Sequence, residues 1–116
     1  MKLPGLVLNA KTFQEAPAGT LIFEAGASGT VMFGIVEGEV EVRLPNGAAR
    51  RLGAGETFGE MAVVDSSPRS ATVVAVTDTK LAVIDRRMFL FLVHETPTFA
   101  LQVMSSMAER LRTEPQ

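Results

Sequence analysis

The residues of this chain that could do chemistry together lie between Gly59 and Ser70. Gly59 has no side chain, so the backbone there can approach another group closely. Residues 60–63 are long enough for one helical turn, whose first N–H groups lack internal partners and attract an anion. Arg69 supplies a planar, permanently charged guanidinium that can hold a phosphate through two hydrogen bonds. Because Glu60 would repel a phosphate unless it faced a hydroxyl, the segment predicts a site for a phosphorylated sugar.

The same segment resembles the phosphate-binding cassette of cyclic nucleotide-binding domains. The two halves of the resemblance are Phe-Gly-Glu-Met-Ala at 58–62 and Pro-Arg-Ser-Ala-Thr at 68–72. Upstream, residues 19–42 are similar to the opening strands of that family, and Gly-Ala-Gly-Glu-Thr-Phe at 53–58 leads into the cassette in the same manner. The resemblance extends over roughly residues 18 to 112, which is nearly the whole chain.

The resemblance implies a role for each residue of the cassette. Arg69 would pair with the cyclic phosphate, together with backbone amides near Met61 and Ala62. Glu60 would accept a hydrogen bond from the ribose 2′-hydroxyl, with Gly59 beside the ribose. The ligand that the resemblance implies is cAMP first and cGMP second.

Ser70 leaves the choice of base open. In the family this position carries small residues, and a hydroxyl there can contact the phosphate or a guanine. A local hydrogen bond within a strand is an equal explanation for a serine. Val42 has a similar ambiguity, because it could line the base or simply pack in the core.

The composition predicts one folded domain over residues 1–116. Hydrophobic residues make up 47% of the chain and charged residues 21%, which is typical of a globular protein. The formal net charge of −2 gives no general attraction for nucleic acid or for a membrane surface, so neither is expected as a partner. There is no cysteine, the longest apolar stretch (88–93) is too short to span a bilayer, and no signal peptide is evident. We expect a cytoplasmic protein.

The pattern from about residue 18 to 85 predicts a mainly β fold, a small antiparallel β-barrel or jelly roll (double-stranded β-helix). Alternating apolar and charged residues at 39–44 indicate a strand with one wet face. Pro-Asn-Gly at 45–47 is a hairpin turn, because Asn-Gly tolerates positive φ. Further strands are expected at 21–23, 31–36, 50–52, 71–76 and 80–84.

Two helices are expected at about 86–112. Asp85 is a candidate N-cap for the first, and Thr96-Pro97 has the pattern of an N-cap followed by proline for the second. Apolar residues then repeat at helical spacing between Phe99 and Leu111. We interpret this stripe as a core contact, with a homodimer seam along the C-terminal helix as the alternative.

Other chemistries have little support. His94 is the only histidine and there is no cysteine, so a metal site is not expected. No catalytic triad or pair of carboxylates is evident, so the chain is not expected to be an enzyme. The last helix is expected to end near Arg112 with no recognition helix or basic face after it, so DNA binding is not expected. Because the end of this helix often supplies a lid over the base in the family, its end near Arg112 puts that lid in doubt.

The sequence therefore predicts a stand-alone cyclic nucleotide-binding module. Ligand binding would move the C-terminal helices and so signal to an effector protein that the sequence does not name. The alternative is a structural or protein-interaction module that no longer responds to nucleotide. Loss of the ligand would be expected to remove Arg69 or Glu60, and both are present. A jelly-roll enzyme is a more distant alternative.

Overall fold

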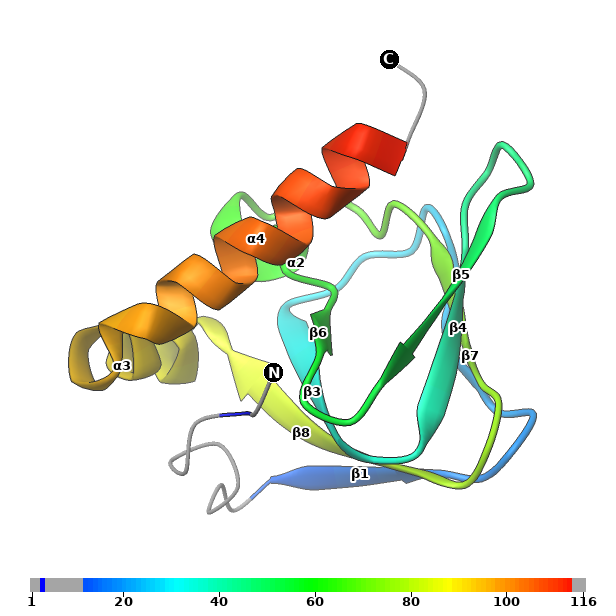
Figure 1. Cartoon of the computed structure of the whole chain (residues 1–116), viewed down its shortest axis with the longest axis horizontal. Coiled ribbons are helices and arrows are strands. Elements are labelled where there is room, and N and C mark those ends of the chain that lie inside the picture. The colour runs from blue at the N-terminus through cyan, green and yellow to red at the C-terminus, as the bar shows by residue number, and fades with distance from the viewer. Residues whose placement is uncertain (1–2, 4–11, 114–116) are drawn as a thin grey trace.

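The computed structural model describes Leu3 and residues 12–113, which form a two-sheet β-roll followed by helices (Figure 1). The elements, in chain order, are β1 Phe13–Ala16, β2 Leu21–Phe23, β3 Val31–Glu37, β4 Glu39–Arg43, β5 Ala49–Gly53, β6 Thr57–Phe58, α2 Met61–Val64, β7 Thr72–Ala75, β8 Thr79–Asp85, α3 Arg86–Glu95 and α4 Pro97–Thr113.

The strands form two antiparallel sheets of four. One sheet has the order β1-β8-β3-β6 and the other β2-β7-β4-β5, so neighbouring strands are often distant in sequence. This arrangement confirms the predicted jelly roll with C-terminal helices. The closed-barrel form is not observed, because no strand pairing joins the two sheets among the described residues. β1 lies before residue 18, where no element was predicted, and it pairs with β8.

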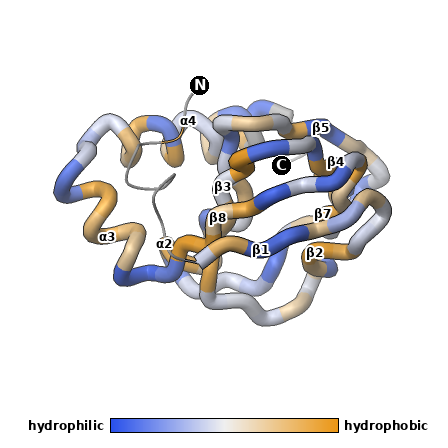
Figure 2. The backbone as a smooth tube through the Cα atoms, turned by 90° about the horizontal axis from the view of Figure 1, so that it is seen from below, coloured by the Kyte–Doolittle hydropathy of each residue, from blue (hydrophilic) through white to orange (hydrophobic). Residues whose placement is uncertain are grey.

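Local signals in the sequence account for several boundaries. The β4–β5 hairpin turns at Gly47, which has a φ of +92° and donates to the Leu44 carbonyl at 3.0 Å. Asp85 caps α3, since its Oδ1 accepts from the amide of Met88 at 2.8 Å, as predicted. Along the strands, hydrophobic and hydrophilic residues alternate in colour (Figure 2), as expected for sheets with one buried face.

Two apolar clusters hold the fold together. The first fills the space between the sheets and includes the stacked rings of Phe33 and Phe58, whose centroids lie 5.3 Å apart. The second joins the helices to the roll and includes Leu92, Phe99 and Val103. The site described below lies at the end of the roll that α4 covers (Figure 1).

The apolar stripe predicted for α4 is correct only in part. Phe99 and Val103 are buried in the second cluster, as expected of a core contact. Met104 and Leu111 were predicted to share that contact, but they are 61% and 65% exposed. The face of α4 that meets the roll includes Met107, which packs against the same cluster, and polar Gln102, which donates to the Gly55 carbonyl.

Candidate ligand-binding site

Arg69 lies in the loop between α2 and β7, and the loop between β2 and β3 fixes its backbone. The Arg69 amide donates to the Ala27 carbonyl at 2.9 Å, and the Gly26 amide donates to the Arg69 carbonyl at 2.8 Å. Pro68 precedes Arg69 and restricts the backbone where the chain turns toward β7. Two segments more than 40 residues apart therefore set the position of one side chain.

The Arg69 guanidinium lies in a narrow slot. Its Cζ is 4.2 Å from the centroid of the Phe23 ring, a distance typical of a cation–π contact. Gly29 and Gly59 border the slot, because a Cβ on Gly29 would overlap the guanidinium and one on Gly59 would lie 2.8 Å from Nη1. Gly59 also has a φ of +80°, which favours glycine. The slot therefore requires a glycine on both sides of the cation.

The charge of Arg69 has no counter-anion among the described residues. The side chain is 7% exposed, and its one hydrogen bond runs from Nη1 to the Gly59 carbonyl at 3.3 Å. The buried Nε atom has no hydrogen-bond partner in the described structure. Burial lowers the pKa of Arg69, but a guanidinium remains charged at neutral pH. A buried cation in this state favours the binding of an anion, because an unpaired buried charge is costly.

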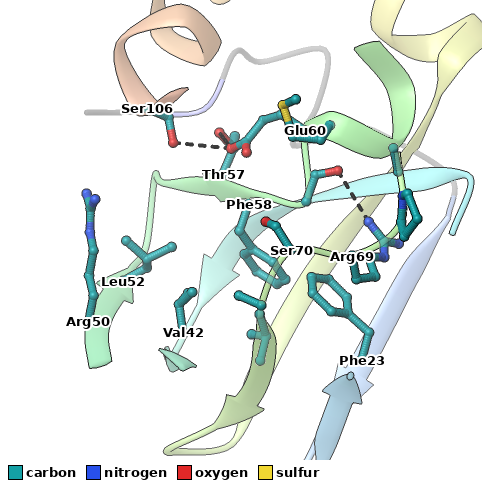
Figure 3. A pocket seen from close by; sticks show the side chains of 16 residues that line it. Phe23, Val42, Arg50, Leu52, Thr57, Phe58, Glu60, Arg69, Ser70 and Ser106 are labelled. Atoms are coloured by element: carbon teal, nitrogen blue, oxygen red, sulfur yellow. Dashed lines mark hydrogen bonds between the residues drawn. The ribbon is translucent and has the colours of Figure 1, made fainter. Parts of the chain in front are cut away.

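Glu60 lies on the other side of the site, at the junction of β6 and α2. Its Oε1 accepts from Thr57 Oγ1 at 3.1 Å and from Ser106 Oγ of α4 at 3.2 Å (Figure 3). The residue is 1% exposed. Two hydroxyl groups thus donate to Oε1, and a sugar hydroxyl would be a donor of the same kind.

The structure brings all the predicted site residues to one cavity of about 50 Å³ between α2, α4 and the inner face of the roll. Phe23, Val42, Leu52, Phe58 and Val73 provide most of its apolar wall (Figure 3). The predicted residues that line it are Gly59, Glu60, Met61, Ala62, Arg69 and Ser70. Ser70 is exposed, so its hydroxyl lies at the rim.

The amides of α2 were predicted to attract an anion. Ala62 N donates to the Gly59 carbonyl at 3.4 Å, which is long for a hydrogen bond, whereas Val63 N donates to Glu60 O at 3.0 Å. The Ala62 amide can therefore exchange its weak internal bond for a bond to a ligand oxygen at little cost. The amide of Val63, which closes the turn, already has a good hydrogen bond to the Glu60 carbonyl.

A second, more polar cavity of about 450 Å³ lies between β5, β6 and α4. The two cavities share Arg50, Leu52, Thr57 and Ser106. Nucleotide-sized ligands occupy pockets of about 300–1,000 Å³, so the first cavity alone is too small for one. Movement of α4 would join the two spaces, since Ser106 belongs to both.

Sequence reasoning did not identify Phe23, Gly29, Thr57 and Ser106 as part of the site. Thr57 lies three residues before Glu60, so the spacing alone could have predicted that the two side chains lie close together. Gly29 and Phe23 approach Arg69 through strand pairing and loop contacts, and Ser106 approaches Glu60 through helix docking. No local pattern in the sequence marks such contacts.

The comparisons with known proteins agree with this geometry. The family model described as the cyclic nucleotide-binding domain matches residues 13–96, which is most of the chain. The chain belongs to the cyclic nucleotide-binding domain family. Domains of this family are regulatory and not catalytic. No group of His, Cys, Asp and Glu that could hold a metal ion is found in the described part of the chain, and none of its helices is long and apolar enough to cross a membrane.

Relatives in the family are between 31% and 40% identical to this chain over the aligned residues. The cyclic AMP receptor protein of Thermus thermophilus is 38% identical over 101 residues, 83% of this chain and 47% of that protein. The crystal structure of the Thermus thermophilus catabolite activator protein superposes with a TM-score of 0.76 at 35% identity, covering 94% of this chain and 54% of that one.

A further structure comes from work on a cyclic-GMP-dependent signalling pathway in bacterial phytopathogenesis. It superposes with a TM-score of 0.74 at 30% identity, covering 90% of this chain and 86% of that one. The chain spans about a quarter to a half of the length of the first curated relatives that it matches.

Proposed function

We propose that this domain is a cyclic nucleotide sensor that binds cAMP, with cGMP as the second candidate. The observation that carries the proposal is the buried guanidinium of Arg69, which has no counter-anion among the described residues. A cyclic phosphate would supply that anion, and the amides near Met61 and Ala62 would add donors to its other oxygens. Ser70, at the rim, can assist there.

The second half of the proposal concerns the sugar. The Glu60 carboxyl would accept a hydrogen bond from the ribose 2′-hydroxyl, with Gly59 close to the ring. A carboxyl group and a phosphate can share one site in this arrangement, because Glu60 would face the sugar hydroxyl and Arg69 would face the phosphate. The base would lie against the apolar wall that includes Val42 and Leu52. That wall is equally suited to adenine and guanine, so the order of cAMP and cGMP is left to measurement.

Binding would be communicated through the C-terminal helices. Glu60 contacts α4 directly through Ser106, so occupancy of the site would shift α4 toward a second arrangement. An effector protein would respond to that change. We propose that the domain acts in the cytoplasm, which is consistent with a sequence without cysteine.

Thermal unfolding with and without nucleotide tests the proposal. At 100 times its dissociation constant, a ligand that binds only the folded state adds about 2.7 kcal/mol to the free energy of unfolding. For a domain of this size we expect the Tm to rise on the order of 10 °C with cAMP or cGMP. The matched control is 5′-AMP, which keeps the base and ribose but lacks the cyclic phosphate. No shift with millimolar cAMP and cGMP would contradict the proposal and favour an interaction module that no longer responds to nucleotide.

The exposed apolar residues of α4 favour a homodimer as a further part of the proposal. Leu101, Met104 and Leu111 are each more than half exposed on this helix. We expect a dimer at tens of micromolar chain, and we expect Leu101→Glu combined with Met104→Glu to produce a monomer, because two charges on each helix would be buried in the seam. Light scattering measures both masses. A parent chain that is monomeric at that concentration would exclude the dimer.

A further inference from the structure

Two polar side chains of α4 connect this helix to the segment that carries the site. Gln102 Nε2 donates to the Gly55 carbonyl at 2.8 Å. Ser106 Oγ donates to Glu60 Oε1 at 3.2 Å (Figure 3). Gln102 and Ser106 are four residues apart, so they lie on the same face of the helix. The bond from Ser106 therefore ends on the same carboxyl group that the proposed function assigns to the sugar.

Glu60 is inaccessible in this arrangement. It is 1% exposed, so a ligand hydroxyl cannot reach its carboxyl oxygens unless a covering group moves. Thr57 belongs to β6 and is held by strand pairing to β3, so it is part of the fixed wall of the roll. Ser106 belongs to a different element, and one hydrogen bond of 3.2 Å holds its hydroxyl on the carboxyl group.

We propose that Ser106 and the sugar hydroxyl of the ligand compete for Glu60, so that Ser106 sets the affinity of the site and couples it to α4. This inference rests on the proposed function, since it concerns the same carboxyl group. The two hydroxyl groups are chemically equivalent donors, and Oε1 already accepts from both Thr57 and Ser106, so a sugar hydroxyl that binds Oε1 takes the place of Ser106. When the sugar hydroxyl binds, Ser106 loses its acceptor, while the apolar contact of α4 and the bond from Gln102 remain.

The competition lowers the apparent affinity of the site. Only the fraction of molecules in which Ser106 has left Glu60 can accept the sugar, and the apparent dissociation constant rises in inverse proportion to that fraction. Removing the Ser106 hydroxyl should therefore strengthen nucleotide binding. If Ser106 were an ordinary ligand contact, removing its hydroxyl would weaken nucleotide binding instead.

The test compares Ser106→Ala with Ser105→Ala in the full chain. Ser105 is the adjacent residue on α4, and its side chain is exposed, so the same substitution there removes a hydroxyl without touching Glu60. Calorimetric titration with cAMP and with cGMP should give about 3- to 30-fold tighter binding for Ser106→Ala and no tightening for Ser105→Ala. Gln102→Ala loosens α4 without touching Glu60, and it should strengthen binding by a smaller factor.

A second measurement does not depend on nucleotide. Amide hydrogen exchange of residues 97–113 should be faster in Ser106→Ala than in the parent chain or in Ser105→Ala, because α4 loses one of its contacts. Binding by Ser106→Ala where the parent chain shows none would be strong support for competition.

Three outcomes would overturn the inference. Weaker binding by Ser106→Ala would identify Ser106 as a direct ligand contact. Unchanged affinity and unchanged exchange would mean that the hydroxyl does not hold α4. If neither form binds cAMP or cGMP but exchange is faster in Ser106→Ala, the proposed function fails and the competition fails with it, while the Ser106 contact itself is supported.

Discussion

Arg69→Met is expected to remove nucleotide binding while leaving the domain at least as stable as the parent chain. The guanidinium is the cationic partner proposed for the cyclic phosphate, and truncation of one member of a buried, hydrogen-bonded charge pair costs about 2–5 kcal/mol of binding free energy. That range corresponds to a loss of affinity of about 30-fold or more. At a nucleotide concentration that saturates the parent chain, the ligand-induced rise in Tm should therefore be lost or strongly reduced.

The stability of this variant should change in the opposite direction from its affinity. Arg69 is a buried charge without a carboxylate partner among the described residues, and replacing such a charge with an apolar side chain is often neutral or stabilising. Methionine follows the same unbranched path as arginine, and its sulfur makes favourable contacts with rings such as Phe23.

Thermal unfolding of Arg69→Met with and without cAMP separates these two effects. Arg51→Met is the matched control, because Arg51 is exposed on β5 and pairs with Glu39 at 2.9 Å, away from the site. The control should keep the whole ligand-induced rise in Tm. A rise in Arg69→Met equal to that of the parent chain would exclude Arg69 as the phosphate partner. A large loss of stability without ligand would mean that the guanidinium is needed for the fold.

Glu60→Gln is expected to weaken binding by about 10- to 100-fold, the second largest effect. The amide keeps the shape of the carboxyl group, but a hydrogen bond to a charged acceptor is worth about 1.5–3 kcal/mol and one to a neutral acceptor less. The lost energy should depend on the ribose 2′-hydroxyl. We therefore expect 2′-deoxy-cAMP to bind the parent chain weakly and to bind Glu60→Gln with little further loss.

Calorimetric titration of both chains with both ligands completes a double-mutant cycle. The coupling energy between the residue and the hydroxyl isolates their interaction from general effects of the substitution. If the losses simply added, Glu60 and the 2′-hydroxyl would not be in contact, and the assignment of the sugar to Glu60 would be wrong. The measurement also bears on the competition with Ser106, which requires that contact.

The parts of the fold that the sequence predicted correctly are those fixed by neighbouring residues. The Asn46-Gly47 turn and the Asp85 cap depend on groups within about four residues, and both were found where they were expected. In the cassette, Gly59 and Arg69 are ten residues apart, and the structure brings them together through Nη1 and the Gly59 carbonyl.

Contacts between distant elements could not be predicted in the same way. Gly29 borders the guanidinium because the β2–β3 loop hydrogen-bonds to the Arg69 backbone. Ser106 reaches Glu60 across 46 residues because α4 docks on the end of the roll. The apolar spacing of α4 predicted a helix correctly, but spacing does not reveal which side chains a partner surface covers, and Met104 was wrongly assigned to the core for that reason.

The burial of both Arg69 and Glu60 has a consequence for the rate of association. The chain has a formal net charge of −2, and Arg69, the proposed phosphate partner, is buried. Long-range electrostatic attraction should therefore contribute little to the association rate of an anionic ligand. The ligand must wait for the site to open, and binding that requires such a change is slower than simple encounter. Loop and helix openings of this kind take microseconds to milliseconds. In a sensor built in this way, the rate of opening would set the upper limit on how fast binding can follow a change in nucleotide concentration.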